Sequence, residues 1–185
     1  LVFTIYPVGI FLTTRLNPIP FVKKTLKIGL FAAATNSSAA TLPLNTKTCT
    51  EELGCSKEIS SFVLPTGMTI NMNGTAIMQV VATLFVAGCA GYDVTFGQLV
   101  VVALLVLIAS VGTPAAPGAG AIILFTILSG LGYVNDSALL AYSLILAINR
   151  PIEMLLTALN VVGDSAASIY VAKSEGMLDE TKYNA

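Results

Sequence analysis

The sequence predicts an all-α membrane protein built from interrupted helices, and three observations support this prediction. Hydrophobic residues make up 55% of the 185 residues, and charged residues only 10%. Soluble domains carry about 25% charged residues, so this chain cannot cover a water-facing surface of ordinary size. Between Ile59 and Asn135 the single charged residue is Asp93. Several apolar runs are nonetheless shorter than the ~20 helical residues that cross a bilayer.

The composition also narrows the classes of function. The net charge is −1, from nine basic and ten acidic residues, so nothing favours nucleic acid as a partner. Histidine is absent, which removes the commonest transition-metal ligand. The three cysteines lack paired spacing and predict small core residues rather than a disulfide framework or metal site. The first residues are apolar and lack the features of a signal peptide, so residues 1–22 are expected to be the end of a truncated helix and a linker.

Two apolar segments are broken in the middle by small and helix-breaking residues. In 23–58, "LKIGLFAAA" is followed by "TNSSAATLP"; in 96–135, "QLVVVALLVLIA" is followed by "SVGTPAAPGAGA". A half-length helix, an irregular tip and a second half-length helix predict a re-entrant hairpin, whose tip must face protein or a water-filled cavity. Paired interrupted segments mark the binding site of secondary transporters. Ordinary helices joined by Gly-rich loops are the structural alternative.

Between the two hairpins, residues 59–95 contain the polar stretch "TGMTINMNGTAIMQ". Gly67 and Gly74 each lower helix stability by ~1 kcal/mol, and Asn71 and Asn73 compete for backbone hydrogen bonds. A helix unwound at membrane depth frees carbonyl oxygens, and Na⁺ is typically held by such carbonyls. The stretch therefore predicts an unwound transmembrane helix with a sodium site. A polar kink satisfied by its neighbours is the alternative.

The last helix, expected at 136–172, carries a polar stripe. A 3.6-residue repeat places Asn149, Glu153, Asn160 and Asp164 on one face. A charge at the bilayer centre costs at least ~2.5 kcal/mol, so this face must point into the protein. Buried ion pairs without a role in transport are the alternative. In order, the expected segments are the truncated helix and linker (1–22), first hairpin (23–58), unwound helix (59–95), second hairpin or gate (96–135), last helix (136–172) and a polar, frayed tail (173–185).

These motifs resemble those of the glutamate transporter family, the dicarboxylate/amino acid:cation symporters. "NSSAATLP" resembles the first re-entrant tip, "TINMNGTA" the seventh-helix signature, "SVGTPAAPGAGAI" the second tip and "NVVGD" the last-helix motif of that family. The resemblance covers nearly the whole chain and implies a C-terminal transport-domain fragment. It implies a sodium symporter of the cell (inner) membrane, an elevator mechanism, N-terminal scaffold helices outside this chain, and a homotrimer when full length.

The resemblance also implies two sodium sites and a substrate site. In the substrate site, Ser38 and Asn160 would bind the substrate carboxylate, and Glu153 would bind its amine. One sodium site would use the carbonyls of Gly67 and Asn160, the Asn71 side chain and the Asp164 carboxylate. The second would use the carbonyls of Thr69, Ser110, Val111 and Thr113. The substrate site would be lined by Ser38, Thr75, Ala116, Gly120, Glu153, Leu156, Thr157 and Asn160.

Departures from the family pattern bear on the substrate and the ions. Leu156 stands where members that bind aspartate or glutamate have an arginine, and Glu153 where they have an aspartate. Without the arginine, an acidic side chain in a buried site would be unpaired, which costs several kcal/mol. Asn73 replaces an aspartate of a third ion site, and Gln79 a glutamate of potassium-coupled members. Neither that third site nor proton or potassium countertransport is therefore expected.

The sequence thus favours a sodium-coupled symporter of a small neutral amino acid, with no organic cofactor and no enzymatic activity. A dicarboxylate or acidic amino-acid symporter is the first alternative, with Arg150 standing in for the lost arginine. An intramembrane aspartyl protease that uses Asp93 and Asp164 is an alternative from another class, since two carboxylates sharing a proton are its chemistry.

Overall fold

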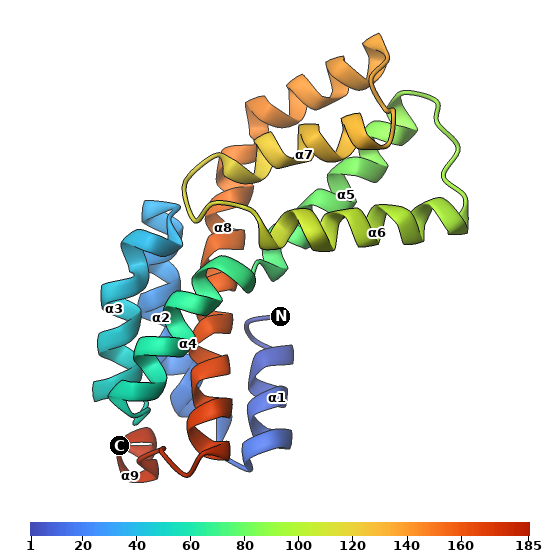
Figure 1. The fold of residues 1–185 in the computed structure, drawn as a ribbon. Coiled ribbons are helices and arrows are strands. Elements are labelled where there is room, and N and C mark those ends of the chain that lie inside the picture. Colours follow the sequence, from blue (N-terminus) through green and yellow to red (C-terminus); the bar gives the residue numbers. More distant parts are fainter.

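A computed structural model describes all 185 residues, and it is helical throughout apart from turns and one isolated β-bridge (Figure 1). The expected all-α class is therefore confirmed. The helices are α1 (Ile5–Thr14), α2 (Pro18–Thr35), α3 (Ser38–Glu51), α4 (Lys57–Ile70), α5 (Asn73–Cys89), α6 (Phe96–Val111), α7 (Ala119–Gly130), α8 (Asp136–Ser174) and α9 (Glu180–Asn184).

Helices α2 and α3 lie side by side and form a helical hairpin, called hairpin 1 below. Helix α2 begins at Pro18, earlier than the expected residue 23, because Asn17 accepts a hydrogen bond from Ile19 and Pro18 suits a first helical position. Helix α2 ends at Asn36, which adopts the left-handed conformation (φ 48°). Ser37 then starts α3 by accepting a hydrogen bond from the Ala40 amide (3.2 Å).

The other two expected interruptions also correspond to breaks in the helices. Helix α4 ends at Ile70 and α5 begins at Asn73, so the break falls inside the polar stretch noted in the sequence. Helices α6 and α7 form hairpin 2, whose tip is the irregular segment 112–118. Figure 1 shows this tip, in yellow, reaching toward the tip of hairpin 1. Three breaks therefore lie near the middle of the molecule.

The molecule has two lobes. The lobe of hairpin 1 consists of α1–α4, α9 and the C-terminal part of α8, and the lobe of hairpin 2 consists of α5–α7 and the N-terminal part of α8 (Figure 1). Helix α8 connects the two lobes. It runs for 39 residues from the lobe of hairpin 2 to the lobe of hairpin 1, and it changes direction along its course (Figure 1). Pro151 lies inside it and removes one backbone hydrogen bond, which is the usual cause of such a bend. Asn149, Glu153, Asn160 and Asp164, predicted to share a face, are all buried.

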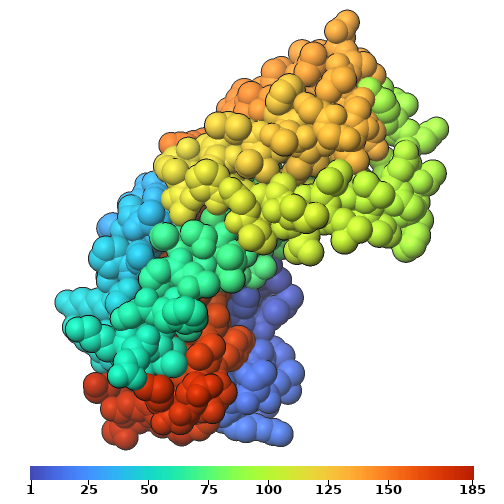
Figure 2. Space-filling model, viewed as in Figure 1, coloured from blue at the N-terminus to red at the C-terminus, as the bar shows by residue number.

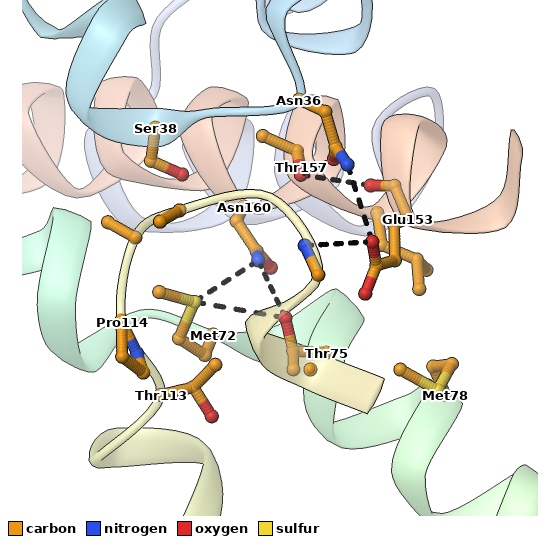
Figure 3. A pocket seen from close by; sticks show the side chains of 15 residues that line it. Asn36, Ser38, Met72, Thr75, Met78, Thr113, Pro114, Glu153, Thr157 and Asn160 are labelled. Carbon is orange, nitrogen blue, oxygen red and sulfur yellow. Dashed lines mark hydrogen bonds between the residues drawn. The ribbon is translucent and has the colours of Figure 1, made fainter. Parts of the chain in front are cut away.

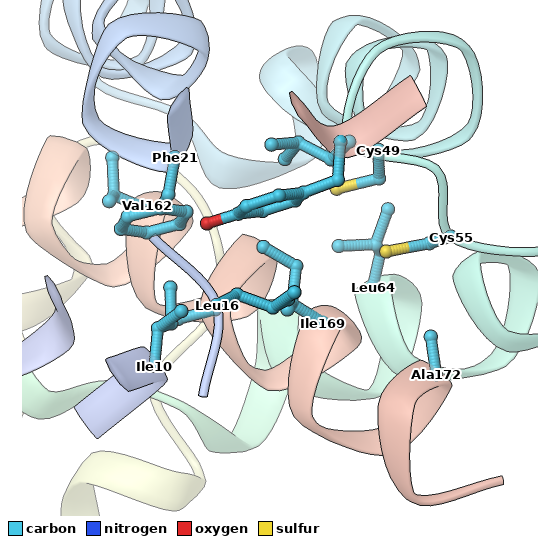
Figure 4. Packing of buried hydrophobic residues seen from close by; sticks show 12 residues of the cluster. Ile10, Leu16, Phe21, Cys49, Cys55, Leu64, Val162, Ile169 and Ala172 are labelled. Carbon is cyan, nitrogen blue, oxygen red and sulfur yellow. The ribbon is translucent and has the colours of Figure 1, made fainter. Parts of the chain in front are cut away.

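The tail is more ordered than the sequence analysis expected. Residues 180–184 form α9 instead of fraying, and the side chain of Tyr183 is completely buried. Tyr183 belongs to a cluster of 12 buried residues contributed by α1–α4, α8 and the segments between them (Figure 4). The tail was expected to fray because most of its residues are polar. Its one aromatic residue near the end, Tyr183, is nevertheless buried in the lobe of hairpin 1, and this burial orders the tail.

The outer surface is apolar, with 32 large hydrophobic residues exposed. Contiguous apolar surface of this extent is rare in soluble monomers and typical of membrane or protein contacts. Two stretches are long and apolar enough to cross a membrane, Lys57–Cys89 and Asp136–Ser174. The lobe of hairpin 1 contains eight of the nine basic residues, namely Arg15, Lys23, Lys24, Lys27, Lys47, Lys57, Lys173 and Lys182.

Candidate functional site

A small cavity lies where the two hairpin tips meet the first turn of α5 and the middle of α8 (Figure 3). Its volume is about 30 Å³, and one water molecule needs ~10–15 Å³ on this scale, so the tips must move apart before an amino acid can enter. The lining includes all eight residues expected at the substrate site. The fifteen lining residues are Asn36, Ser38, Met72, Thr75, Met78, Thr113, Pro114, Ala115, Ala116, Gly118, Gly120, Glu153, Leu156, Thr157 and Asn160.

Glu153 is the only charged side chain in this lining. It is 8% exposed, and its Oε2 accepts hydrogen bonds from Asn36 Nδ2 (3.3 Å) and the Gly118 amide (3.2 Å). Its Oε1 has no hydrogen-bond partner. Arg150 Nη1 lies 3.8 Å from Oε2, but the Arg150 side chain is 60% exposed and does not line the cavity. A buried carboxylate with a free oxygen is suited to receive an ammonium group.

Asn36 is a site residue that the sequence analysis did not select. Its Oδ1 accepts a hydrogen bond from Thr157 Oγ1 (2.9 Å) while its Nδ2 donates to Glu153, so it orients that carboxylate. A local signal could have predicted that the chain turns at Asn36. Asn tolerates the positive φ that often ends a helix, and the serine that follows it can cap the start of the next helix. The other lining residues that were not selected are Met72, Met78, Pro114, Ala115 and Gly118, whereas Thr113 was expected at the second sodium site.

Asn160 connects α8 to the first turn of α5. Its Oδ1 accepts a hydrogen bond from the Gly74 amide (2.7 Å), and its Nδ2 donates to Thr75 Oγ1 (3.2 Å) and Met72 Sδ (3.4 Å) (Figure 3). Ser38, across the cavity, lies in the first turn of α3. The amides of a helix N-terminus favour anions, so this wall of the cavity suits a carboxylate.

The four residues expected at the first sodium site come together behind the cavity. Asp164 is 3% exposed and pairs with no basic side chain. Asn71 Nδ2 donates to Asp164 Oδ1 (2.8 Å) and to the Asn160 carbonyl (3.2 Å). Gly67 is so close that a Cβ there would lie 2.5 Å from Asp164 Oδ1. Rotating the Asn71 amide by half a turn would turn its oxygen toward Asp164 Oδ1 and the Asn160 carbonyl, and oxygen is the donor that Na⁺ prefers. The Asn71 nitrogen would then face Asn73 Nδ2, which now donates to Asn71 Oδ1 (2.6 Å).

The four residues expected at the second sodium site lie at two helix ends that touch. Thr69 is in the last turn of α4; Ser110 and Val111 end α6, and α4 packs against α6. The Thr113 amide donates to the Ser110 carbonyl (3.1 Å), which begins the tip of hairpin 2. Ser110 and Thr113 are buried and Val111 is exposed. Of these four residues only Thr113, just beyond the end of α6, lines the cavity.

Comparison with known proteins assigns the family. The model of the sodium:dicarboxylate symporter family matches residues 1–174. The chain belongs to this family. It is 37% identical to excitatory amino acid transporter 5 of Mus musculus over 89% of the chain and 29% of that protein. It is 37% identical to an excitatory amino acid transporter of Caenorhabditis elegans, over 94% of the chain and 34% of that protein. It is 38% identical to excitatory amino acid transporter 2 of Homo sapiens, over 91% of the chain and 29% of that protein.

This membership confirms the resemblance seen in the sequence. The chain spans about a third of the length of the curated relatives it matches. The sodium:dicarboxylate symporter family consists of transporters, so the aspartyl protease alternative is dropped. The structure gives an independent reason. Asp93 lies exposed in the turn after α5, whereas Asp164 of α8 is hydrogen-bonded to Asn71, just before α5 begins, so the length of α5 separates the two carboxylates.

Proposed function

We propose that this chain is the transport core of a sodium-coupled symporter for a small neutral amino acid. One observation carries the proposal. A cavity whose only charged group is the carboxylate of Glu153 lies next to a second buried carboxylate, Asp164, that pairs with no basic side chain. The first suits a zwitterion and the second a monovalent cation, because a buried charge needs an opposite charge beside it.

The cavity lining supports a neutral substrate. The amine of an amino acid would bind Glu153 in place of the Gly118 amide, and the carboxylate would bind Ser38, Asn160 and the start of α3. The side chain would then face Leu156, and none of the lining residues is basic. An acidic side chain in that place would be buried without a cation, which costs several kcal/mol.

Asn160 supports coupling between sodium and substrate. Its carbonyl accepts a hydrogen bond from Asn71 beside Asp164, while its side chain binds Gly74 and Thr75 at the cavity wall. Na⁺, transported as co-substrate, would bind Asp164, Asn71 and the carbonyls of Gly67 and Asn160. An ion that holds this carbonyl therefore also orders the residue that receives the substrate carboxylate. The carbonyls of Thr69, Ser110, Val111 and Thr113 would form the second sodium site and tie the tip of hairpin 2 to the ion.

The surroundings of the site support an elevator-type movement. Hairpins 1 and 2 would be re-entrant, α4–α5 and α8 would cross the cell membrane, and hairpin 2 would open as the gate. The basic lobe of hairpin 1 would face the cytoplasm, since cytoplasmic segments are enriched in Lys and Arg. The exposed apolar surface would contact lipid and N-terminal scaffold helices outside this chain, in a homotrimer.

A dicarboxylate or excitatory amino acid is the second candidate substrate, and one contact favours it. Arg150 Nη1 lies 3.8 Å from Glu153 Oε2 at the edge of the cavity, so a modest change of rotamer would bring a guanidinium toward the substrate. The family description and the names of the relatives point the same way.

The proposal is tested with the full-length protein in proteoliposomes under a Na⁺ gradient. Wild type should take up alanine or serine rather than aspartate or succinate. Leu156→Arg should raise uptake of aspartate relative to alanine by ~10-fold or more, because it supplies the missing cation. Leu156→Met, which keeps an apolar side chain of similar volume, is the control. Preferred uptake of aspartate or succinate by wild type would favour the second candidate.

The sodium site is tested in the same vesicles. Asp164→Asn removes its only full charge and should raise the Na⁺ concentration for half-maximal uptake by ~100-fold. Glu58→Gln, at an exposed acid in the first turn of α4, should leave that concentration unchanged. Uptake by Asp164→Asn with unchanged Na⁺ dependence would refute the assignment.

A further inference from the structure

The segment after α8 folds back onto the lobe of hairpin 1. Residues 175–185, called the clasp below, lie beyond the part of the chain that the family model matches. The Asp179 amide donates to the Gly54 carbonyl (2.8 Å), and the Ser56 amide to the Met177 carbonyl (3.1 Å). Leu178 pairs with Cys55 in an antiparallel β-bridge. The clasp is therefore bonded to the turn between α3 and α4, and Figure 2 shows it in red against that turn.

Lys24 of α2 ties the clasp to hairpin 1. Its ammonium donates to the carbonyls of Glu52 (2.9 Å), Lys182 (2.8 Å) and Tyr183 (2.9 Å). An ammonium has three hydrogens, and all three are used here. These carbonyls lie at the C-terminal ends of α3 and α9, where the helix has no backbone donors left for them and where positive charge is favoured. One side chain thus joins both arms of hairpin 1 to the clasp.

Tyr183 is the apolar anchor of the clasp. Its ring belongs to the same 12-residue cluster as Phe21, Leu64 and Ile169, and its hydroxyl donates to the Asn17 carbonyl (2.9 Å), just before α2 begins. Burial raises the pKa of the Tyr183 phenol to about 12, so it remains a donor at physiological pH. An ion pair of Lys173 with Glu180 also joins the end of α8 to the clasp, and one of Lys27 with Glu52 joins the two arms of hairpin 1.

Hairpin 2 has no such fastening where its outer arm begins. The first turn of α6 makes only local hydrogen bonds, between Thr95 and Gln98, and Phe96 is 81% exposed. The loops at this end contact each other through Tyr92 and Asn135, which bond to the Gly132 and Ala90 carbonyls. No chain segment crosses from another part of the molecule to hold α6 there.

We propose that the clasp holds hairpin 1 rigid throughout transport, while hairpin 2 opens as the gate proposed above. Asn36 and Ser38 at the tip of hairpin 1 then form a fixed wall of the cavity. Without the clasp, the arms of hairpin 1 would separate from α4 and α8 at their base, and substrate would leak without sodium. The leak rests on the transport function proposed above; the rigidity of hairpin 1 does not.

The rigidity is tested by amide hydrogen exchange in the full-length protein. Lys24→Met and Tyr183→Ala should speed exchange across residues 36–51 by ~5-fold or more, the factor that loss of ~1 kcal/mol of local hydrogen bonding produces. Lys23→Met, at the exposed neighbour, and Tyr133→Ala, at a buried tyrosine in the lobe of hairpin 2, are matched controls and should leave that region unchanged. Unchanged exchange of 36–51, with faster exchange of 176–184, would overturn the proposal.

The functional consequence is tested in vesicles. Lys24→Met should increase Na⁺-independent efflux of preloaded amino acid, and Lys23→Met should not. If wild type itself shows no Na⁺-driven uptake, the proposed transport function fails, while the exchange experiment still decides the clasp. A Lys24→Met protein that transports with wild-type coupling despite a mobile hairpin 1 would overturn the role of the clasp.

A disulfide tests whether the clasp stays closed, and is useful even where Lys24→Met folds poorly. Opposed residues of an antiparallel bridge lie within the ~4.4–6.8 Å that a disulfide spans, so Leu178→Cys can bond to Cys55. In a Cys49→Ala/Cys89→Ser background, oxidation with copper phenanthroline should leave Na⁺-driven uptake unchanged. Loss of uptake on oxidation, restored by dithiothreitol, would show that the clasp must open and would overturn the proposal.

Discussion

Hairpins 1 and 2 share the order helix, tip, helix, but the molecule holds them differently. Both arms of hairpin 1 pack against α8, and α3 also packs against α4; the clasp closes their base. Hairpin 2 packs on α5, and only its inner arm α7 makes a substantial contact with α8. The tip of hairpin 1 is the two-residue turn at Asn36 and Ser37, whereas that of hairpin 2 spans 112–118. Because mobility follows sparse packing and irregular backbone, this difference supports the proposed roles of hairpin 1 as a wall and of hairpin 2 as a gate.

The largest expected effect is a difference in how much the same core deletion in each hairpin lowers the free energy of unfolding. Ile28→Ala in α2 should lower the free energy of unfolding by ~4 kcal/mol, because Ile28 packs between Ala32 and Val161 in a part of the core that cannot collapse. Ile127→Ala in α7 makes the same deletion beside Val102 and should cost nearer ~2 kcal/mol, since hairpin 2 can shift into the space. Thermal unfolding of the full-length protein in detergent measures both. Equal losses of unfolding free energy in the two variants would contradict the view that hairpin 1 is packed more rigidly than hairpin 2.

The next effect concerns the carboxylate that touches both tips. Glu153→Gln weakens a charge-assisted hydrogen bond to the Gly118 amide, which is worth ~1.5–3 kcal/mol, so exchange at 112–118 should rise ~10–100-fold. The tip of hairpin 1 should change much less, because Thr157 also holds Asn36. Hydrogen exchange on one sample compares the two tips directly. A tip of hairpin 1 that loosens as much as the other would contradict the comparison.

The smallest effect concerns the one side-chain hydrogen bond that joins the tips. Ser37 Oγ donates to the Ala115 carbonyl (3.1 Å) and also caps α3. Ser37→Gly removes the donor but costs only a few tenths of a kcal/mol as a cap, so hairpin 2 should open ~5-fold more often. The rate of thiol modification at Ala116→Cys measures the opening. Ser56→Gly, an N-cap of α4 away from the tips, is the control and should not change this rate.

Much of the site could be predicted from the sequence because its signals are local. The spacing of Asn149, Glu153, Asn160 and Asp164 placed them on one face, and all four are buried. The glycine and the two asparagines of "TINMNGT" marked the helix break at Asn71. The eight residues at the substrate site were implied by the family resemblance rather than by local signals, and all of them line the cavity. The orientation of the Asn71 amide toward Asp164 and the pairing of Glu153 with the Gly118 backbone had no signal in the spacing of residues.

By itself, the sequence determined the class of protein, the breaks in its helices and the polar face of its last helix. These features follow from local free-energy terms. A charge is unfavourable in lipid, a glycine destabilises a helix, and an asparagine side chain competes for backbone hydrogen bonds. Only the tertiary structure decided that Lys24 binds the carbonyls of Glu52, Lys182 and Tyr183 and that the tail is a clasp. The reason is physical: a hydrogen bond forms only within ~3.5 Å, and the fold alone brings residues 24, 52 and 183 that close.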